Sequence, residues 1–405
     1  MSRFRVLDSG DPCDRARWVR MWEDSPQRPP HAHPVLSEPA LKPGERLVAA
    51  VLEDDDSTAM GPAGTVLHVL IVRPVPGPLG ASGRCVDLIS PLGYAGPLVW
   101  GAQDVAALAR TFWAEFDVWA AEVGAVSEFV RLSLLDSVLP SPAAITPRLT
   151  NHVAVLPDTA EQLWASFAPK VRQNARRALR SGVTIEIDET GERHREFLHI
   201  HDATMDRHDS DDSYRLEADV LTGLHRELPG GFAYVYAMSE GTAVSVDLVL
   251  MGTDTAYYHL GGTLTEAFGL RPNDLVKTAA MEHARSTGRT DFVLGGGLQD
   301  GDGLERYKRG FAGGRTIDFR TTERILDPAA HARLVADLEA RMQQEREAGD
   351  RPEWVDGPEF FPAYRRRFTV PARLGSEALA RAGVSVTGTA VVGAGGGASG
   401  QESAR

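Results

Sequence analysis

The segment that most constrains the fold is a glycine-dense turn that directly follows an apolar strand. The strand is expected at 291–294, and five glycines fall within residues 295–303. Glycine has no Cβ, so the backbone can turn sharply here and approach a ligand closely. The turn runs into Tyr307 and Lys308, and a lysine at such a place is suited to neutralising negative charge that develops during a reaction. The pattern favours group transfer at a polar, anionic substrate, although an ordinary surface turn has the same composition.

Composition bounds the class of protein. A length of 405 residues with 42% hydrophobic residues is enough for two or three domains with their own cores. The net charge of −13 argues against a protein that coats DNA or other nucleic acid nonspecifically. Cys13 and Cys85 have no metal or redox spacing, and no apolar run approaches the ~18 residues of a membrane span. We therefore expect a cytoplasmic protein without a membrane span.

The order of predicted elements is that of an α/β protein. In the first part, strands at 46–52 and 65–73 precede a helix at 105–123 and a strand at 127–133, and the proline-rich stretch 139–147 predicts a linker. The second part contains strands at 152–156, 183–187, 232–238, 243–251, 255–260 and 291–294, with helices at 159–167, 169–179, 193–205, 217–228 and 275–286 between them.

Four regions follow from this order. We expect an N-terminal domain at 1–148 and a second domain, carrying the site, at 149–327. A helical extension is expected at 328–370. Alanine, glycine, serine and valine dominate from Leu374 onward, and this composition buries too little apolar surface to fold. Residues 371–405 are therefore predicted to be disordered.

The helix at 169–179 is strongly basic in an acidic chain. Arg172, Arg176 and Arg180 recur every four residues, so they share one face and cannot neutralise one another. No acidic residue occurs between Ala168 and Ile185. The face is suited to a phosphate or an RNA strand; a solvated face paired with distant carboxylates is the alternative.

A second glycine junction lies at 257–262, where a strand ends before the residues 268–273 open the next helix. Such a junction presents unpaired amides and the positive end of a helix to an anion or a carbonyl oxygen. Arg271 and Asn273 lie at this helix start. His259 is a candidate base, or a hydrogen-bonded histidine of the core.

Histidines and aspartates gather at 194–212, but their spacing does not suit a metal. His199 and His201 fall on different faces of a helix, so they form no compact ligand set. No metal site is predicted. The chain also lacks a Walker-type phosphate loop and the Gly-x-Ser-x-Gly turn of serine hydrolases.

Four segments, at 166–178, 258–262, 270–273 and 303–311, together resemble the FemAB-like transferases. Residues 90–97 also look like the Ser-Pro-Tyr-Gly-Tyr-x-Gly-Pro stretch of that family's N-terminal domain, with Leu92 in place of a tyrosine. The resemblance implies two tandem GNAT-like (acyl-CoA N-acyltransferase fold) domains, with mixed sheets flanked by helices and a cleft between the domains.

The resemblance also implies an activity. Family members that are understood transfer an amino acid from aminoacyl-tRNA to an amine on a peptidoglycan precursor or on a small molecule such as a peptide-like antibiotic. No cofactor is implied. The chain lacks the long charged helical insertion of many peptidoglycan enzymes, which weakens the cell-wall assignment.

An acyl-CoA-dependent N-acyltransferase is the alternative function, and a noncatalytic tRNA- or glycan-binding module is a third. The junction at 269–276 lacks the paired glycines of a CoA pyrophosphate loop, Pro272 removes an amide donor, and Asp274 would repel a pyrophosphate. These features favour tRNA as the donor. An open cleft between splayed strands near this junction would favour CoA.

The family's Phe-Lys pair, which acts at the acyl ester of the donor, matches Tyr307 and Lys308. Lys308 is then expected to stabilise the oxyanion or the leaving 3′-hydroxyl, and Tyr307 to stack on the terminal adenosine. Asp247 is a possible proton acceptor or amine anchor, or else a carboxylate facing solvent at a strand edge. The residues predicted to bind substrate are Arg172, Arg176, Arg180, Asn174, His259, Asn273 and Arg271.

Overall fold

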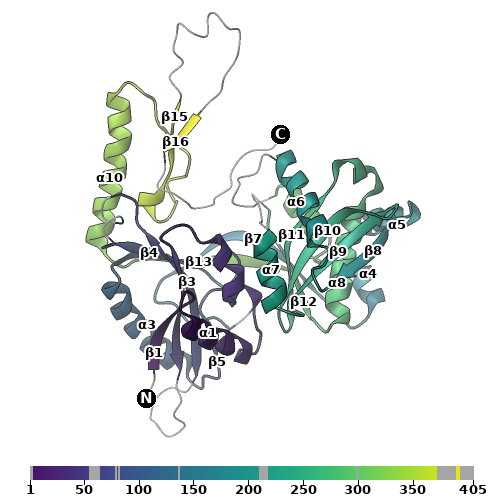
Figure 1. Ribbon diagram of the computed structural model, residues 1–405, viewed down its shortest axis with the longest axis horizontal. Helices are drawn as coiled ribbons and strands as arrows, with labels where there is room; N and C mark the ends of the chain where they lie inside the picture. The colour runs from purple at the N-terminus through teal and green to yellow at the C-terminus, as the bar shows by residue number, and fades with distance from the viewer. Residues whose placement is uncertain are drawn as a thin grey trace, which may run out of the picture.

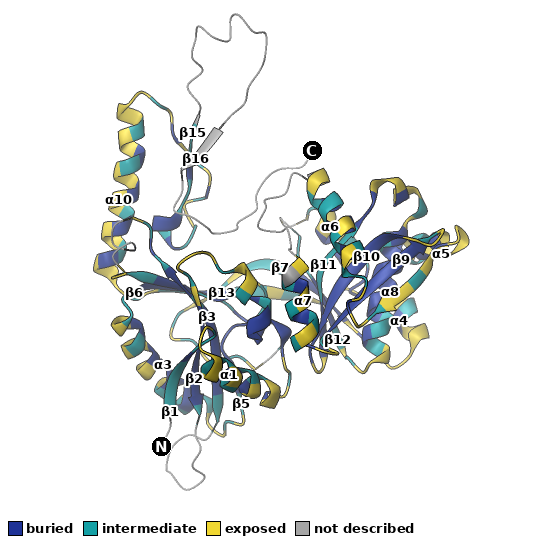
Figure 2. Cartoon of the chain, in the orientation of Figure 1, coloured by how far each residue is buried: buried dark blue, intermediate teal, exposed yellow. Residues whose placement is uncertain are grey.

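The chain forms two lobes that lie side by side, with a long helix next to the first (Figure 1). The computed structural model describes residues 3–53, 64–77, 80, 83–135, 137–208, 218–297, 299, 301–371 and 389–392. Strands of both lobes are buried, whereas the outer faces of the helices are exposed (Figure 2).

In the first lobe, both faces of the sheet are covered. Successive residues of a strand point to opposite faces, and in β2 (Arg46–Glu53) one set packs against α1 (Pro12–Asp24) while the other packs against α3 (Val105–Glu122). This explains why the strand is apolar at almost every position. The other elements of the lobe are β1 (Arg3–Asp8), η1 (Pro30–Ala32), η2 (Pro34–Leu36), η3 (Glu38–Ala40), β3 (Thr65–Pro74), β4 (Val86–Ile89), β5 (Leu98–Trp100) and β6 (Ala125–Arg131).

The second lobe is built in the same way. Residues of β9 (Phe232–Ser239) alternate between two cores. One lies under α6 (His194–His208) and α7 (Ala218–Glu227), and the other lies under α4 (Ala160–Ser166), α5 (Pro169–Arg180) and α8 (Pro272–Ser286). The other elements are β7 (Ile145–Val155), α4 (Ala160–Ser166), α5 (Pro169–Arg180), β8 (Thr184–Asp188), β10 (Thr242–Met251), β11 (Thr255–Thr263), η5 (Thr265–Leu270), α8 (Pro272–Ser286), β12 (Asp291–Gly295), α9 (Gly303–Arg309) and β13 (Thr316–Ile325).

The two lobes repeat one strand pattern. In the first, β2, β3 and β4 pair antiparallel, and β6 then pairs parallel to β4 after the helix α3. In the second, β9, β10 and β11 pair antiparallel, and β12 pairs parallel to β11 after α8. A parallel pair requires such a crossover connection. The predicted α/β class, with mixed sheets flanked by helices, is confirmed.

Within the described residues, the lobes share one continuous sheet of 13 strands. β13 lies between β6 of the first lobe and β7 of the second and pairs antiparallel with both. Its partner β7 begins at Ile145, so the linker predicted at 139–147 is wrong at its C-terminal end. The cause is tertiary, because Ile145 and Pro147 pair with residues of β13 that lie far along the chain.

Most other predicted elements agree with the structure to within a few residues. The helix predicted at 275–286 begins earlier, at Pro272, because proline is favoured in the first turn of a helix. The helix α9 inside the glycine-rich stretch was not expected.

The C-terminal region packs on the first lobe. Buried Arg365 donates to the Asp87 carboxylate, which also accepts from Arg73 at 2.7 Å. The elements are α10 (Pro328–Glu347), β14 (Glu353–Trp354), η6 (Ala363–Arg365), β15 (Phe368–Pro371) and β16 (Thr389–Val392). Apart from Pro371 and β16, the tail predicted to be disordered at 371–405 lies outside the described residues.

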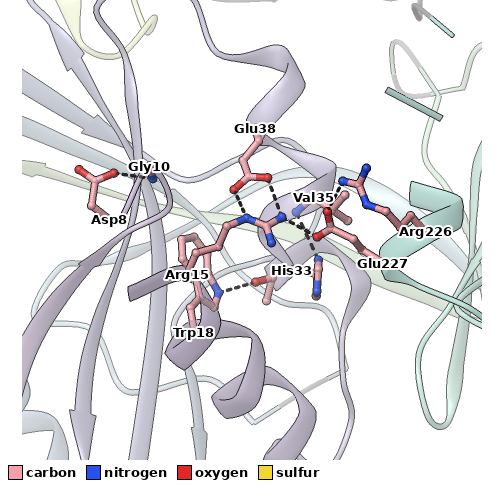
Figure 3. A network of polar contacts seen from close by, with 10 residues as sticks. Asp8, Gly10, Arg15, Trp18, His33, Val35, Glu38, Arg226 and Glu227 are labelled. Atoms are coloured by element: carbon pink, nitrogen blue, oxygen red, sulfur yellow. Dashed lines mark hydrogen bonds and ion pairs between the residues drawn. The ribbon is translucent and has the colours of Figure 1, made fainter. Parts of the chain in front are cut away.

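An ion network ties the lobes together on one side of the sheet (Figure 3). Arg15 of α1 donates to Glu38 at 2.7 Å and to Glu227 of α7 at 2.6 Å. Val35 packs into the second lobe's core beside them. The lobes are thus joined by polar and apolar contacts as well as by the shared sheet.

Arg15→Ala is expected to lower the free energy of unfolding by about 1 kcal/mol, because partly exposed ion pairs contribute little. The loss should shrink at high salt, which screens such pairs. Denaturant titrations at low and high ionic strength measure both effects. Arg46→Ala is the control, since Arg46 pairs with Asp8 inside the first lobe and its side chain is 54% exposed. An equal effect of the two variants would contradict a role for Arg15 between the lobes.

Candidate functional site

The glycine-rich turn positions Lys308 through the short helix α9. The Asp302 carboxylate caps this helix by accepting from Glu305 N at 2.6 Å. One helical turn later, Lys308 points inward, is only 9% exposed, and donates from Nζ to Gly296 O at 2.6 Å. Gly295 has a φ of 81°, a conformation that strongly favours glycine. The turn therefore delivers a buried ammonium to the end of β12.

A pocket of about 240 Å³ opens beside this lysine. It lies where β11 and β12 part: the two strands pair only from Thr255–Tyr257 to Asp291–Val293, and the next residue of each strand, Tyr258 and Leu294, lines the pocket. Its lining residues are Tyr258, Asn273, Lys277, Leu294, Gly303, Leu304, Tyr307 and Lys308.

A second lysine shares the pocket. Lys277 of α8 is 3% exposed and its Nζ lies 2.7 Å from Oδ2 of Asp247, which is 2% exposed. The same Nζ lies 3.1 Å from the centre of the Tyr258 ring, and Lys308 Nζ lies 5.8 Å from it. Burial raises the pKa of Asp247 and lowers the pKa of Lys277, while their mutual attraction opposes both shifts.

The position of Asp247 excludes one of the two sequence-based interpretations, a carboxylate facing solvent at a strand edge. Its strand β10 lies inside the sheet between β9 and β11, so the carboxylate is not at a strand edge and does not face solvent. Asp247 does not line the pocket itself, but it pairs with Lys277, which does.

Lys308 has an unusually acidic ammonium. Burial, and then repulsion from Lys277, lower the pKa of Lys308 to about 8. An ammonium with a pKa close to neutral pH can give and take a proton during turnover. Perturbed groups of this kind in a pocket are typical of catalytic sites.

Two other predicted site residues lie in the same pocket. The Tyr307 hydroxyl donates to Asn273 O at 3.4 Å, and the Tyr307 ring packs edge-on against Phe311 with centroids 5.0 Å apart. Asn174 is linked indirectly, because its Nδ2 donates at 3.2 Å to Asp274 in the first turn of α8. Arg271 precedes that helix in a left-handed conformation and is exposed.

The three arginines of α5 lie outside the pocket. Arg172 donates to the carbonyls of Ala165 and Phe167 at the end of α4, at 2.7 and 2.8 Å. The Arg176 guanidinium lies 5.3 Å from the centre of the Trp164 ring, and Arg180 is exposed.

The basic helix is nevertheless attached to the site. Ala168 N, just before α5, donates at 2.8 Å to the carbonyl of Gly310, which directly follows α9. The cations of α5 that are exposed are Lys170, Arg176, Arg177 and Arg180.

His259 lies in a different cluster, where the lobes meet. The His31 ring from the first lobe is 6.4 Å from His259 and 4.9 Å from Tyr257, and Tyr94 stacks on Tyr257 at 5.9 Å. Burial lowers the pKa of His259 to about 4, so its imidazole is neutral at pH 7. It does not line the pocket beside Lys308.

Sequence reasoning missed four residues around Lys308: Tyr94, Asn151, Tyr258 as a pocket wall, and Lys277. Lys277 carried a usable signal, since it directly follows the apolar pair Leu275 and Val276 in a predicted helix. A lysine on the buried face of a helix needs a partner or a function. For Asn151 no local pattern marked the residue.

Comparison with known proteins agrees with this architecture. Residues 165–309, which include α9, match the family described as "Acetyltransferase (GNAT) domain". The structure is similar to FemX, with 13% identity over 78% of this chain and 97% of that chain and a TM-score of 0.57. It is also similar to the C-terminal domain of a putative lysylphosphatidylglycerol synthetase from Agrobacterium fabrum, with 15% identity over 81% and 97% of the chains and a TM-score of 0.51. No curated protein matches the sequence significantly.

Residues 165–309 thus form an acyltransferase domain of the GNAT class, in a fold whose two lobes repeat one strand pattern. The similarity to FemX confirms the tandem GNAT-like fold that the FemAB-like motifs imply.

None of the helices in the described part of the chain is long and apolar enough to cross a bilayer. The described residues also contain no group of three or more histidine, cysteine or acidic side chains able to hold a metal; residues 209–217 of the histidine- and aspartate-rich stretch are outside this set.

Proposed function

We propose that the protein is an aminoacyl-tRNA-dependent aminoacyltransferase that forms an amide bond between an amino acid and an amine acceptor. The acceptor is a small molecule, such as a peptide-like antibiotic, or a peptidoglycan-type peptide. The observation that carries the proposal is the buried Lys308 ammonium at the wall of an aromatic pocket, on the residues that match the family's Phe-Lys pair.

The chemistry requires little beyond orientation and charge stabilisation. The lone pair of a neutral amine forms a C–N bond with the ester carbonyl carbon, and the carbonyl π electrons move onto its oxygen. Collapse of this intermediate breaks the bond to the 3′-oxygen. One proton passes from the attacking nitrogen to that leaving oxygen, and Lys308, with a pKa of about 8, is suited to carry it.

The surroundings of the pocket support tRNA as the donor. Tyr307 and Tyr258 offer aromatic walls, and stacking of a base on an aromatic side chain is worth about 1–3 kcal/mol. The exposed cations of α5, whose N-terminal end is bonded to the segment after α9, offer contacts for the phosphates of an acceptor stem. Here Arg176 and Arg180 are better placed than Arg172, whose guanidinium already binds carbonyls.

Two observations favour the acyl-CoA alternative. The matching family model is one of acetyltransferases, and β11 and β12 part at the pocket, as an acyl-CoA cleft would require. Against it, α8 begins with Pro272 and carries Asp274 in its first turn, where a pyrophosphate would need amide donors and no negative charge. Burial raises the pKa of Asp274, which reduces but does not remove this objection.

The proposal is tested with total tRNA charged with radiolabelled amino acids and the small-molecule fraction of a cell extract as acceptor. We expect labelled amides of new mass that disappear after ribonuclease treatment. A parallel reaction contains acetyl-CoA and monitors thiol release. Transfer that resists ribonuclease and releases CoA would overturn the tRNA proposal in favour of the alternative.

The pH dependence of transfer should reflect Lys308. The active form of the enzyme is expected to carry a protonated Lys308 ammonium. Therefore kcat should fall as the pH rises through about 8, the pKa of Lys308. Lys308→Arg should lose this falling limb, since a guanidinium stays charged over the whole range. Initial rates between pH 6 and 10, corrected for spontaneous ester hydrolysis, measure the effect. A wild-type rate that keeps rising to pH 10 would contradict the role of the protonated Lys308 ammonium.

A further inference from the structure

A buried amide beside Lys308 lacks a hydrogen-bond partner. Asn151 of β7 is 4% exposed, and its Oδ1 accepts from the Tyr94 hydroxyl at 3.0 Å. Its Nδ2, which carries two N–H groups, has no partner within the part of the chain that is described. An unsatisfied buried donor lowers the stability of a protein. Such a group calls for an explanation, and a ligand atom that binds it is one.

The Asn151 side chain and the Tyr94 hydroxyl lie near Lys308, around Gly295. A Cβ atom on Gly295 would lie 3.2 Å from Lys308 Nζ, 3.8 Å from the Tyr94 hydroxyl oxygen and 4.0 Å from Asn151 Oδ1. Three polar side chains therefore converge on the space that the absence of a side chain at Gly295 leaves open. Two of them come from the second lobe, and Tyr94 comes from the first.

The hydrogen bond from Tyr94 occupies the oxygen of the Asn151 amide and leaves its nitrogen without a partner among the described residues. The Tyr94 ring is held by stacking on Tyr257 and by the edge of His31, with centroids 5.9 and 5.4 Å away. Burial raises the pKa of Tyr94, so its phenol keeps its proton and has a hydrogen to donate. Because the hydroxyl donates to Oδ1, the two hydrogens of Nδ2 are left for another acceptor.

We propose that the Asn151 amide is a second donor, with Lys308, to the carbonyl oxygen that gains charge during transfer, and that Tyr94 positions this amide from the first lobe. The inference rests on the proposed acyl transfer. It gives the first lobe a part in the chemistry, because the donor pair is oriented only when the two lobes are in contact. Asn151 is then a catalytic residue, and Tyr94 is a positioning residue.

The test compares Asn151→Leu, Asn151→Asp, Tyr94→Phe and the Asn151→Leu/Tyr94→Phe double variant. Removing one oxyanion donor lowers kcat by about 10²–10³-fold in enzymes, so we expect a loss of that order for Asn151→Leu with KM within about twofold. Asn151→Asp should behave similarly, because it keeps the acceptor for Tyr94 but loses both N–H donors. Tyr94→Phe should lose about tenfold, and the double variant should be no slower than Asn151→Leu.

A structural role predicts a different outcome. Tyr234→Phe is the matched control, since it also removes a buried tyrosine hydroxyl, one that bonds to His225 at 2.9 Å outside the site. Thermal unfolding of all variants is measured alongside kinetics. The inference is wrong if Tyr94→Phe and the control lose the same stability and both keep nearly the wild-type kcat. It is also wrong if the kcat loss of the double variant equals the product of the two single losses. Tyr94→Phe and Asn151→Asp keep the test informative if Asn151→Leu does not fold.

Failure of this inference is distinguishable from failure of the proposed function. The variants are assayed in whichever transfer the wild type performs, ribonuclease-sensitive or CoA-releasing, because an oxyanion forms in both. Wild-type transfer that releases CoA overturns the tRNA donor and leaves the Asn151 test intact. Asn151 variants as fast as the wild type overturn the inference alone, and a wild type inactive in both reactions overturns both.

Discussion

Replacement of Lys308 by methionine is expected to lower kcat for transfer by about 10²–10³-fold, because the variant loses the charge that we propose meets the developing oxyanion. The loss should exceed that of any other single substitution among the residues that line the pocket, since the same ammonium is also proposed to move the proton from the acceptor amine to the leaving oxygen. Binding of uncharged tRNA should change by less than about twofold, because the exposed cations of α5 remain in place.

The experiment measures kcat and KM for transfer, and the affinity for uncharged tRNA in a separate binding assay. Methionine has nearly the length of lysine and suits the buried position, so the fold should persist. Lys42→Met, an exposed lysine outside the pocket, is the matched control and should behave like the wild type. A Lys308→Met protein that binds tRNA normally and transfers at the wild-type rate would exclude Lys308 from catalysis.

Replacement of Asp247 by alanine is expected to lower the free energy of unfolding by about 3–5 kcal/mol. The substitution leaves the Lys277 ammonium buried without its partner, and an uncompensated buried charge is far more costly than the loss of the contact itself. Contact with the Tyr258 ring compensates only in part.

The physical cause is tested by the double variant Asp247→Ala/Lys277→Met. Removing both charges should restore much of the stability, so the two single effects should not add. Denaturant unfolding of the four proteins of this cycle measures the coupling. Asp254→Ala removes an exposed aspartate in the turn between β10 and β11 and should change stability by less than about 0.5 kcal/mol. Additive single effects would contradict a buried ion pair.

Local pattern was enough to predict most strands and helices. β9 and β10 are apolar runs bounded by turn residues, and α5 begins at a proline and ends before Ser181 and Gly182. Where pairing across the chain decides the structure, the pattern failed. Residues 145–147 have a linker's composition but form a strand, because β13 lies beside them.

The candidate site was predictable in the same uneven way. Tyr307 and Lys308 stand in a recognisable motif next to glycines that need special backbone conformations, so sequence alone could mark them. Asn273 follows Pro272 at a helix start, which is also a local signal. The three arginines of α5 do share a helix face, but Arg172 is bound to carbonyls of the preceding helix, a contact no periodicity reveals.

Sequence by itself determined the α/β class, the position of the glycine turn and the lysine that follows it, because these depend on the conformational range of glycine and on the period of apolar residues. Only the tertiary structure decided what that lysine faces. Burial beside Lys277 sets its acidity, the parting of β11 from β12 opens the pocket, and the contact between the lobes brings Tyr94 and Asn151 to the same glycine. These properties depend on distances between residues that are remote in the chain, and no local pattern encodes such distances.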